Sequence, residues 1–194
     1  MVIDISQEIF SCRTYPGDPA PVRDRLMKME DGALYNLSAF SMCVHNGTHL
    51  DAPAHFFKDG KTIDAFAPEV FTGDCYVARH TGDVLAADAQ RILAEAAACG
   101  AARRILIAGD AVVTEEAARV FADAKLLLIG NESQSVGPEN APMAVHKILL
   151  SAEVILLEGV ILTDVPAGKY LLCAMPLLLA DCEGAPCRAV LIQQ

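Results

Sequence analysis

The feature that most restricts the fold is a set of short apolar segments alternating with helical segments in the second half of the chain. Three apolar segments predict buried strands: Arg104–Ala108, residues 125–129 and residues 154–157. Between them, Thr114 is suited to cap a helix that runs to about Ala122, and residues 141–151 predict a further short helix. Such alternation is typical of a sheet covered by helices.

The remaining segments add strands at both ends of the chain. Strands are predicted at residues 2–6, 33–44, 75–80, 169–174 and 188–192, with a turn at residues 15–19 and a helix at 88–99 that Gly100 ends. The strand at 33–44 is expected to lead straight into a cluster of histidines. The chain is therefore predicted to be a single α/β domain (mixed α+β) over residues 1–194, with a mixed sheet.

Composition narrows the class of protein. Hydrophobic residues make up 53% of the 194 residues, enough to fill a core. The net charge is −10 and no basic patch occurs, so a nucleic-acid partner is not expected. The apolar runs are too short to cross a bilayer, and no signal peptide is recognisable, so no membrane partner is expected either. The seven cysteines form no CxxC pair, which favours reduced thiols and a cytoplasmic location.

The segment HNGTHLDAPAH, residues 45–55, carries three of the five histidines. Gly47 and Pro53 argue against a continuous helix, so we expect a strand end and an irregular loop in which the rings of His45 and His49 converge. With Asp51 they form two imidazoles and one carboxylate, a suitable ligand set for Zn²⁺ or Mn²⁺. Isolated histidines are usually structural, but this density indicates a metal site.

His55 has two possible roles at this stage. It lies four residues beyond Asp51, so it could be a further ligand. Alternatively it stays free and acts as a general acid and base, because the pKa of an imidazole is close to neutral pH.

Glu158 and His146 are the other two ionisable residues that stand out. Glu158 lies within the apolar stretch VILLEGVIL, where an unpaired carboxylate is costly. It could form an ion pair with Arg188, and His146 could be a surface residue beside Lys147. Considered with the histidine cluster, both instead suggest a second metal position.

Asp51 could then bridge two metals, one held by His45 and His49 and the other by His146 and Glu158. Two metals would lower the pKa of a water and polarise a carbonyl. That chemistry is hydrolysis of an amide or an ester.

The motif His45-x-Gly47-Thr48-His49-x-Asp51-x-Pro53-x-His55 resembles the signature of the metal-dependent cyclase family, which includes bacterial kynurenine formamidases and isatin hydrolases. Supporting matches are Tyr15-Pro16-Gly17-Asp18, Ser135, His146-Lys147-x-Leu149-Leu150, Glu158-Gly159 and Pro186-x-Arg188-Ala189. The resemblance implies a swivelling β/β/α fold and a homodimer or homotetramer whose site is completed near a subunit boundary. It also implies the two metal positions described above, with His55 as acid and base, and zinc in formamidases or manganese in isatin hydrolases.

The sequence departs from the family pattern in places that bear on the substrate. Tyr15 stands where the formamidases have a tryptophan, and the chain contains no tryptophan. Residues 130–135 differ from the commoner family form, and the segment after Arg104–Ala108 lacks a Lys-Thr pair. Tyr15 could bind an aryl group through its ring or simply pack as a turn residue. Phe56 and Phe57, directly after His55, could line the pocket or belong to the core.

The resemblance implies a metal-dependent arylformamidase of tryptophan catabolism, and N-formyl-L-kynurenine is the best single expectation for its substrate. Two alternatives remain open: a hydrolase of isatin-like cyclic amides or lactones, and a non-catalytic protein that binds a metal or small molecule.

Overall fold

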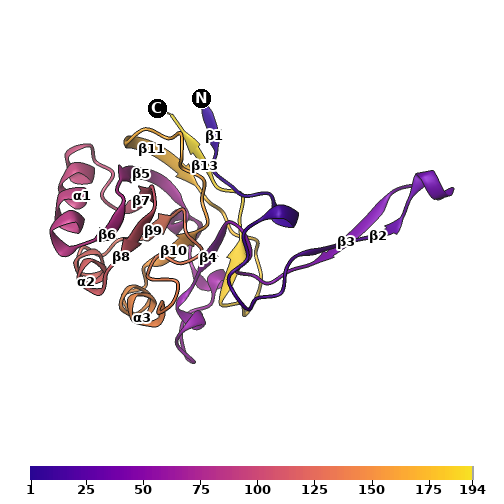
Figure 1. The fold of residues 1–194 in the computed structure, drawn as a ribbon, viewed down its shortest axis with the longest axis horizontal. Helices are drawn as coiled ribbons and strands as arrows, with labels where there is room; N and C mark the ends of the chain where they lie inside the picture. The colour runs from indigo at the N-terminus through magenta and orange to yellow at the C-terminus, as the bar shows by residue number, and fades with distance from the viewer. Residues whose placement is uncertain (194) are drawn as a thin grey trace.

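A computed structural model of the chain describes residues 1–193 and places nine strands in one mixed sheet (Figure 1). The order across the sheet is β1-β13-β11-β5-β7-β9-β10-β4-β12. The strands are β1 (Val2–Asp4), β4 (His49–Asp51), β5 (Thr72–Arg79), β7 (Arg104–Ala108), β9 (Leu128–Asn131), β10 (Ile155–Glu158), β11 (Gly168–Cys173), β12 (Gly184–Pro186) and β13 (Val190–Ile192).

The centre of the sheet is parallel and its two flanks are antiparallel. β5, β7, β9 and β10 pair in parallel, whereas β4 and β12 on one flank and β11, β13 and β1 on the other pair antiparallel. All residues of β7, β9 and β10 are buried. Burial on both faces explains why these segments are continuous apolar runs in the sequence.

Three helices pack together on one side of the sheet (Figure 1). They are α1 (Ala86–Ala98), α2 (Glu115–Asp123) and α3 (Met143–Ser151). Within β7, Ile105 and Ile107 join the core beneath the helices, whereas Leu106 joins the core on the opposite face. This alternation follows from the two-residue period of a strand. The sheet is therefore sandwiched between two apolar clusters.

A long two-stranded arm projects away from the body (Figure 1). It consists of β2 (Val22–Met27) and β3 (Leu37–Ser41), joined through a 3₁₀ turn at Met29–Asp31. All of β3, and all of β2 except half-buried Met27, is exposed. A smaller two-stranded sheet, β6 (Gly82–Val84) with β8 (Ala111–Val113), lies beside the helices. Four further 3₁₀ turns are Ile9–Ser11, Pro53–His55, Ile63–Ala65 and Pro68–Val70.

The mixed α/β class is confirmed, and most predicted elements are present. Thr114 caps α2 by accepting a hydrogen bond from Ala117 N, and Gly100 follows α1 with φ of +72°. No helix within residues 1–193 has the length and apolar character needed to cross a membrane.

Two predicted strands are placed wrongly. Residues 33–44 do not lead as one strand into the histidine cluster, because β3 is part of the arm and a turn separates it from β4. The strand expected at 125–129 begins three residues later, at Leu128, because Lys125 has φ of +54° and cannot lie in a strand.

Candidate metal centre

β4 and β10 carry three of the predicted site residues. The strand period places His49 and Asp51 on one face of β4, while Leu50 between them points into the core. β10 pairs antiparallel with β4, and Glu158 lies opposite His49 in the register. All three polar side chains are buried. The pairing of these two strands therefore brings Glu158 next to His49 and Asp51, although it lies more than a hundred positions away in the sequence.

His45 reaches the cluster through a tight turn before β4. Gly47 has φ of +66°, in the left-handed region that favours glycine, and its carbonyl accepts a hydrogen bond from His49 Nδ1 at 3.0 Å. A Cβ at this position would lie 3.1 Å from Cys12 Cβ. The turn lets the rings of His45 and His49 approach to 5.2 Å between centroids. The predicted irregular loop is therefore confirmed.

The carboxylate of Asp51 lies between two sets of ligand atoms. Its Oδ1 is 2.8 Å from His45 Nδ1 and 3.4 Å from His49 Nε2. Its Oδ2 is 3.5 Å from His146 Nε2, which is also 3.2 Å from Glu158 Oε1. Two groups of three potential ligands result, each with all atoms within 4.8 Å, and Asp51 belongs to both.

Hydrogen bonds on the outer edges of the rings fix their orientation. His49 Nδ1 donates to the Gly47 carbonyl, and His146 Nδ1 donates to the Pro142 carbonyl at 2.9 Å. Both rings therefore turn Nε2 toward the carboxylates, which is the arrangement that metal-binding histidines adopt. Glu158 Oε1 accepts a hydrogen bond from Val136 N at 2.7 Å, which holds this carboxylate in place. The donor set and its supports fit divalent metals.

The electrostatics of the cluster favour protonated imidazoles beside charged carboxylates. Burial would lower the pKa of His49 and of His146, but Asp51 and Glu158 outweigh this and raise the pKa of each to about 10. Burial would raise the pKa of Asp51, and the imidazoles of His45, His146 and His49 instead hold it well below its usual value. A metal would replace these protons and satisfy the same carboxylates.

His55 lies beside the cluster on the 3₁₀ turn Pro53–His55, directly after β4. Its ring centroid is 4.1 Å from that of His45 and 6.2 Å from that of His146. Burial lowers the pKa of His55, and the two neighbouring histidines lower it further against the opposing effect of Asp51. A neutral imidazole at neutral pH can accept a proton.

A cavity of about 260 Å³ joins these residues. Its walls are formed by Tyr15, Asp18, His45, His49, Asp51, His55, Phe56, Gln134, Ser135, Pro142, His146 and Glu158. The six suggested ligand and acid/base residues and Tyr15 therefore lie at one cavity. Asp18 belongs to the Tyr15-Pro16-Gly17-Asp18 match. Gln134 and Pro142 were not predicted, because each belongs to a loop with no recognisable spacing relative to the histidines.

Comparison with known proteins shows the family. Residues 3–138 match the family model Cyclase, "Putative cyclase". The chain belongs to the cyclase family. It is 32% identical to a kynurenine formamidase from Erythrobacter litoralis (strain HTCC2594), over 97% of this chain and 92% of that protein.

Two solved structures share the cyclase-family fold. One, a potential metal-dependent hydrolase with cyclase activity, superimposes with a TM-score of 0.83 at 27% identity, covering 98% of this chain and 96% of the other. The other, isatin hydrolase A from Labrenzia aggregata bound to benzyl benzoate, has a TM-score of 0.82 at 19% identity, covering 100% and 94%. The latter shows likeness of fold alone.

Glu158 does not pair with Arg188, and His146 is not a surface residue, so both of these alternatives are wrong. Arg188 lies at the surface and pairs with Asp4 at 2.5 Å. His146 is 3% exposed and faces the carboxylates, not the solvent beside Lys147. Both residues are buried at the smaller cavity, which explains why their sequence neighbours are apolar.

The aromatic residues near the cyclase-family motif divide between pocket and core. Tyr15 lines the cavity, and its hydroxyl donates to the Glu139 carbonyl at 2.5 Å. Phe56 lines the cavity, and its ring centroid lies 5.0 Å from that of His146 with the two rings tilted by 43°. Phe57 packs against the core beneath the helices.

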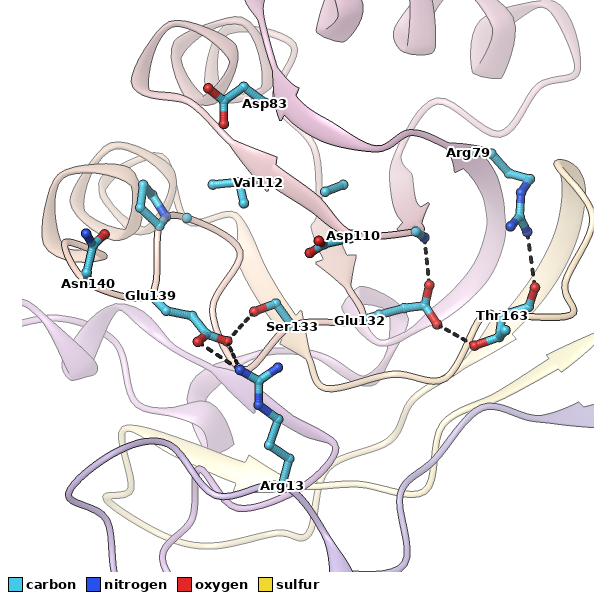
Figure 2. A pocket seen from close by; sticks show the side chains of 14 residues that line it. Arg13, Arg79, Asp83, Asp110, Val112, Glu132, Ser133, Glu139, Asn140 and Thr163 are labelled. Atoms are coloured by element: carbon cyan, nitrogen blue, oxygen red, sulfur yellow. Dashed lines mark hydrogen bonds and ion pairs between the residues drawn. The ribbon is translucent and has the colours of Figure 1, made fainter.

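A second and larger cleft, of about 800 Å³, involves the same loop between β9 and α3 (Figure 2). In Figure 2, Glu139 points toward Arg13 and Ser133, and Glu132 points toward Thr163. Glu132 also accepts a hydrogen bond from Gly109 N. None of the residues lining this cleft belongs to the two groups of potential ligands. Of these two cavities, only the smaller one is lined by potential metal ligands.

Proposed function

We propose that this chain is a metal-dependent amide hydrolase that holds two divalent metal ions. The observation that carries the proposal is the position of Asp51, whose two oxygens each face a different set of buried ligand atoms. His45, His49 and Asp51 would hold one ion, and Asp51, His146 and Glu158 the other. Zinc is the first choice, because imidazole and carboxylate ligands suit it, and manganese is the alternative.

Bound divalent ions would make hydroxide available near neutral pH and polarise the carbonyl that is attacked. His55 is the acid and base of the reaction. Its neutral imidazole accepts the proton released as water adds to the carbonyl carbon, and then donates that proton to the departing nitrogen. The products are a carboxylic acid and an amine.

The substrate is a small N-formyl arylamine, with N-formyl-L-kynurenine as the best single choice. The relationship to the kynurenine formamidase from Erythrobacter litoralis supports this choice. The rings of Tyr15 and Phe56 in the cavity wall support an aromatic substrate as well. Tyr15 would take the place of the tryptophan found in related formamidases.

The direct test is turnover by protein purified without chelator and loaded with zinc or with manganese. We expect N-formyl-L-kynurenine to be hydrolysed with release of formate, and activity to be lost with chelator and restored by metal. Metal content measured by plasma mass spectrometry should reach two ions per chain. A protein that binds no metal under these conditions would contradict the proposal.

An isatin-like cyclic amide or lactone is the second candidate substrate, favoured by the shared fold with isatin hydrolase A. Comparing kcat/KM for isatin and for N-formyl-L-kynurenine separates the two. A protein that binds metal yet turns over neither class would instead be a non-catalytic binding protein.

We also propose that the chain assembles as a homodimer or homotetramer through the arm formed by β2 and β3. Large apolar side chains are exposed along it, including Val22, Leu26, Leu34 and Phe40. An isolated two-stranded hairpin is marginally stable in water, so the arm needs a surface to pack on. Residues 22–41 contain as many basic as acidic side chains, so the net charge of −10 belongs to the body, and the arm of one copy can approach the body of another without strong repulsion.

The assembly is tested by light scattering during gel filtration. We expect a mass of at least twice 20.7 kDa for the unaltered chain. Leu34→Asp, at a side chain that is 90% exposed, should lower the mass without unfolding the body. A monomeric unaltered protein would contradict the proposal.

We place the enzyme in the cytoplasm, because all seven cysteines are free thiols.

A further inference from the structure

Gln134 is a buried glutamine in the loop that separates the smaller cavity from the larger cleft. Its side-chain Nε2 donates to the Gly47 carbonyl at 3.3 Å. The same carbonyl accepts the hydrogen bond from His49 Nδ1. Turning the amide over would bring its oxygen against a carbonyl oxygen, so the orientation of the Gln134 side chain is determined by this contact.

The backbone at Gly159 is shaped to admit this side chain. Gly159 has φ of +67°, and a Cβ there would lie 2.3 Å from Gln134 Nε2. Ser133 accepts a hydrogen bond from Gly159 N through its carbonyl at 2.7 Å, which joins the loop of Gln134 to the end of β10. The amide is therefore bonded to Gly47, and the absence of a Cβ at Gly159 leaves room for it.

The oxygen of the same amide has no partner. Gln134 is 4% exposed, and its Oε1 receives no hydrogen bond from any residue between 1 and 193. A buried acceptor left unpaired is unfavourable, and native structures contain few of them. Because Gln134 lines the cavity beside the two ligand groups, a molecule bound in that cavity can supply the missing donor.

Several other polar groups of the cavity already face a partner, whereas His45 Nε2 and Ser135 Oγ, like Gln134 Oε1, have none within residues 1–193. The inner nitrogens of His49 and His146 and the oxygens of Asp51 and Glu158 face one another as potential metal ligands. The hydroxyl of Tyr15 donates to the Glu139 carbonyl. Of these three atoms, Gln134 Oε1 is the one that can only accept a hydrogen bond, because the Ser135 hydroxyl can also donate and His45 is a potential metal ligand.

We infer that Gln134 Oε1 accepts a hydrogen bond from the N–H of the scissile amide and thereby selects secondary amides over esters. The inference rests on the proposed hydrolase function and specifies its substrate class. An ester of the same shape places an oxygen where the amide has N–H, so Oε1 would remain unpaired and face a second acceptor. Sites that are built to bond an N–H discriminate strongly against analogues that lack it.

The test compares two substrates that differ at this atom alone, formanilide and phenyl formate. Their kcat/KM values are measured for the zinc-loaded unaltered protein and for Gln134→Met, which keeps the length of the side chain and removes the acceptor. The ratio of amide to ester kcat/KM in the variant is divided by that in the unaltered protein, so the intrinsic reactivity of the substrates cancels. We expect this quotient to be about 0.1 or lower.

Gln7 provides a matched control. Its Nε2 donates to the Gly159 carbonyl at 2.8 Å and its Oε1 accepts from Arg13 N at 2.8 Å, so both ends of its amide are paired. Gln7 does not line the cavity. Gln7→Met should therefore leave the amide-to-ester ratio unchanged. Gln134→Leu is a second variant without an acceptor, so the result does not depend on the packing of one thioether.

Three outcomes overturn the inference. An unchanged ratio in both Gln134 variants shows that Oε1 does not recognise the amide. Loss of zinc from these variants, measured by mass spectrometry, shows that Gln134 acts on His49 through Gly47 and not on the substrate. If the metal-loaded unaltered protein hydrolyses neither substrate, the proposed function itself is wrong. This outcome is distinguishable from failure of the inference, because it is seen in the unaltered protein before any variant is compared.

Discussion

The two cavities that flank the loop between β9 and α3 differ in how completely their polar groups are paired. Five buried polar side-chain atoms within residues 1–193 lack a hydrogen-bond partner. Three of them, His45 Nε2, Gln134 Oε1 and Ser135 Oγ, belong to residues that line the smaller cavity, and none belongs to a residue lining the larger cleft. The smaller cavity therefore leaves buried polar atoms that a ligand could pair, although the larger cleft has about three times the volume.

The larger cleft is a junction whose charged groups hold loops together. Glu132 accepts hydrogen bonds from Gly109 N at 2.6 Å and Leu162 N at 2.8 Å. Glu139 pairs with Arg13 at 2.6 Å and accepts from Ser133 Oγ at 2.8 Å. These carboxylates are used within the chain, so a size criterion alone would have chosen the wrong cavity. The comparison predicts that equivalent substitutions will have unequal effects in the two places.

The largest difference is expected between two aspartates, Asp51 in the cavity and Asp110 in the cleft. Asp51→Ala should empty both metal positions, because one carboxylate serves both groups of ligands. Activity should fall by more than about 100-fold, since even partners outside the ligand shell typically cost about 10–100-fold in metal affinity or activity. Metal content by mass spectrometry and kcat/KM for the formyl substrate are the measurements.

Asp110→Ala is the matched control, because Asp110 is exposed and lines the larger cleft. It should keep two metals and the activity of the unaltered protein. Full metal content in Asp51→Ala would rule out the bridging role of Asp51.

The next effect concerns turnover without loss of metal. His55→Gln should retain both metals and lower kcat by about 10²–10⁴-fold, the usual contribution of a general acid and base. His80→Gln is the control, because His80 lies away from the cavity and contacts the Asp83 carbonyl. If His55→Gln instead releases metal, His55 is a ligand, which is the alternative that the sequence left open.

A smaller effect is expected in the pH dependence of stability of the metal-free protein. The pKa of His49 and His146 is raised to about 10 in the fold, above the ordinary 6.5, so their stabilising contribution is complete below pH 6.5 and is lost as the pH rises toward 10. Asp51 and Glu158 have lowered pKa values, so their contribution is lost as the pH falls below their ordinary values of 3.8 and 4.5.

Urea unfolding of the metal-free protein should therefore give a lower free energy of unfolding at pH 9.5 than at pH 6.5. Saturating zinc should weaken this decline, because metal binding requires neutral imidazoles and becomes more favourable as protons leave. Equal stability of the metal-free protein at the two pH values would show that the imidazoles are not held by the carboxylates.

The sequence predicted the cluster of potential metal ligands better than it predicted the residues around them. The spacing of His45, His49 and Asp51 is local, and a glycine turn followed by one face of a strand is enough to bring them together. Glu158 was recognisable because a carboxylate within an apolar strand needs a partner. Gln134 was not, since its significance lies in which atom of the amide stays unpaired, and that depends on contacts with Gly47 and Gly159 far away in the sequence.

The arm shows a similar limit for the fold. Alternation of apolar residues between 33 and 44 predicted a strand correctly within Leu37–Ser41, but it could not tell a strand in the sheet from one that projects. The apolar side chains of the arm are exposed, so alternation of apolar residues does not indicate burial in this segment. Residues 42–48 follow the arm and form the turn before β4 instead of continuing the strand.

The smallest effect is expected for the ion pair that closes the larger cleft. Arg13→Ala removes the contact with Glu139, but the two side chains are 58% and 34% exposed, and surface pairs contribute about 0–1 kcal/mol to stability. Glu139 keeps its bond from Ser133 Oγ, and Tyr15 still donates to the Glu139 carbonyl. The free energy of unfolding should therefore change by less than about 1 kcal/mol in urea, and kcat/KM should stay within about twofold of the unaltered value. A tenfold loss of turnover would show that the cleft and the cavity work as one site through the Glu139–Tyr15 contact, and the contrast between them would no longer hold.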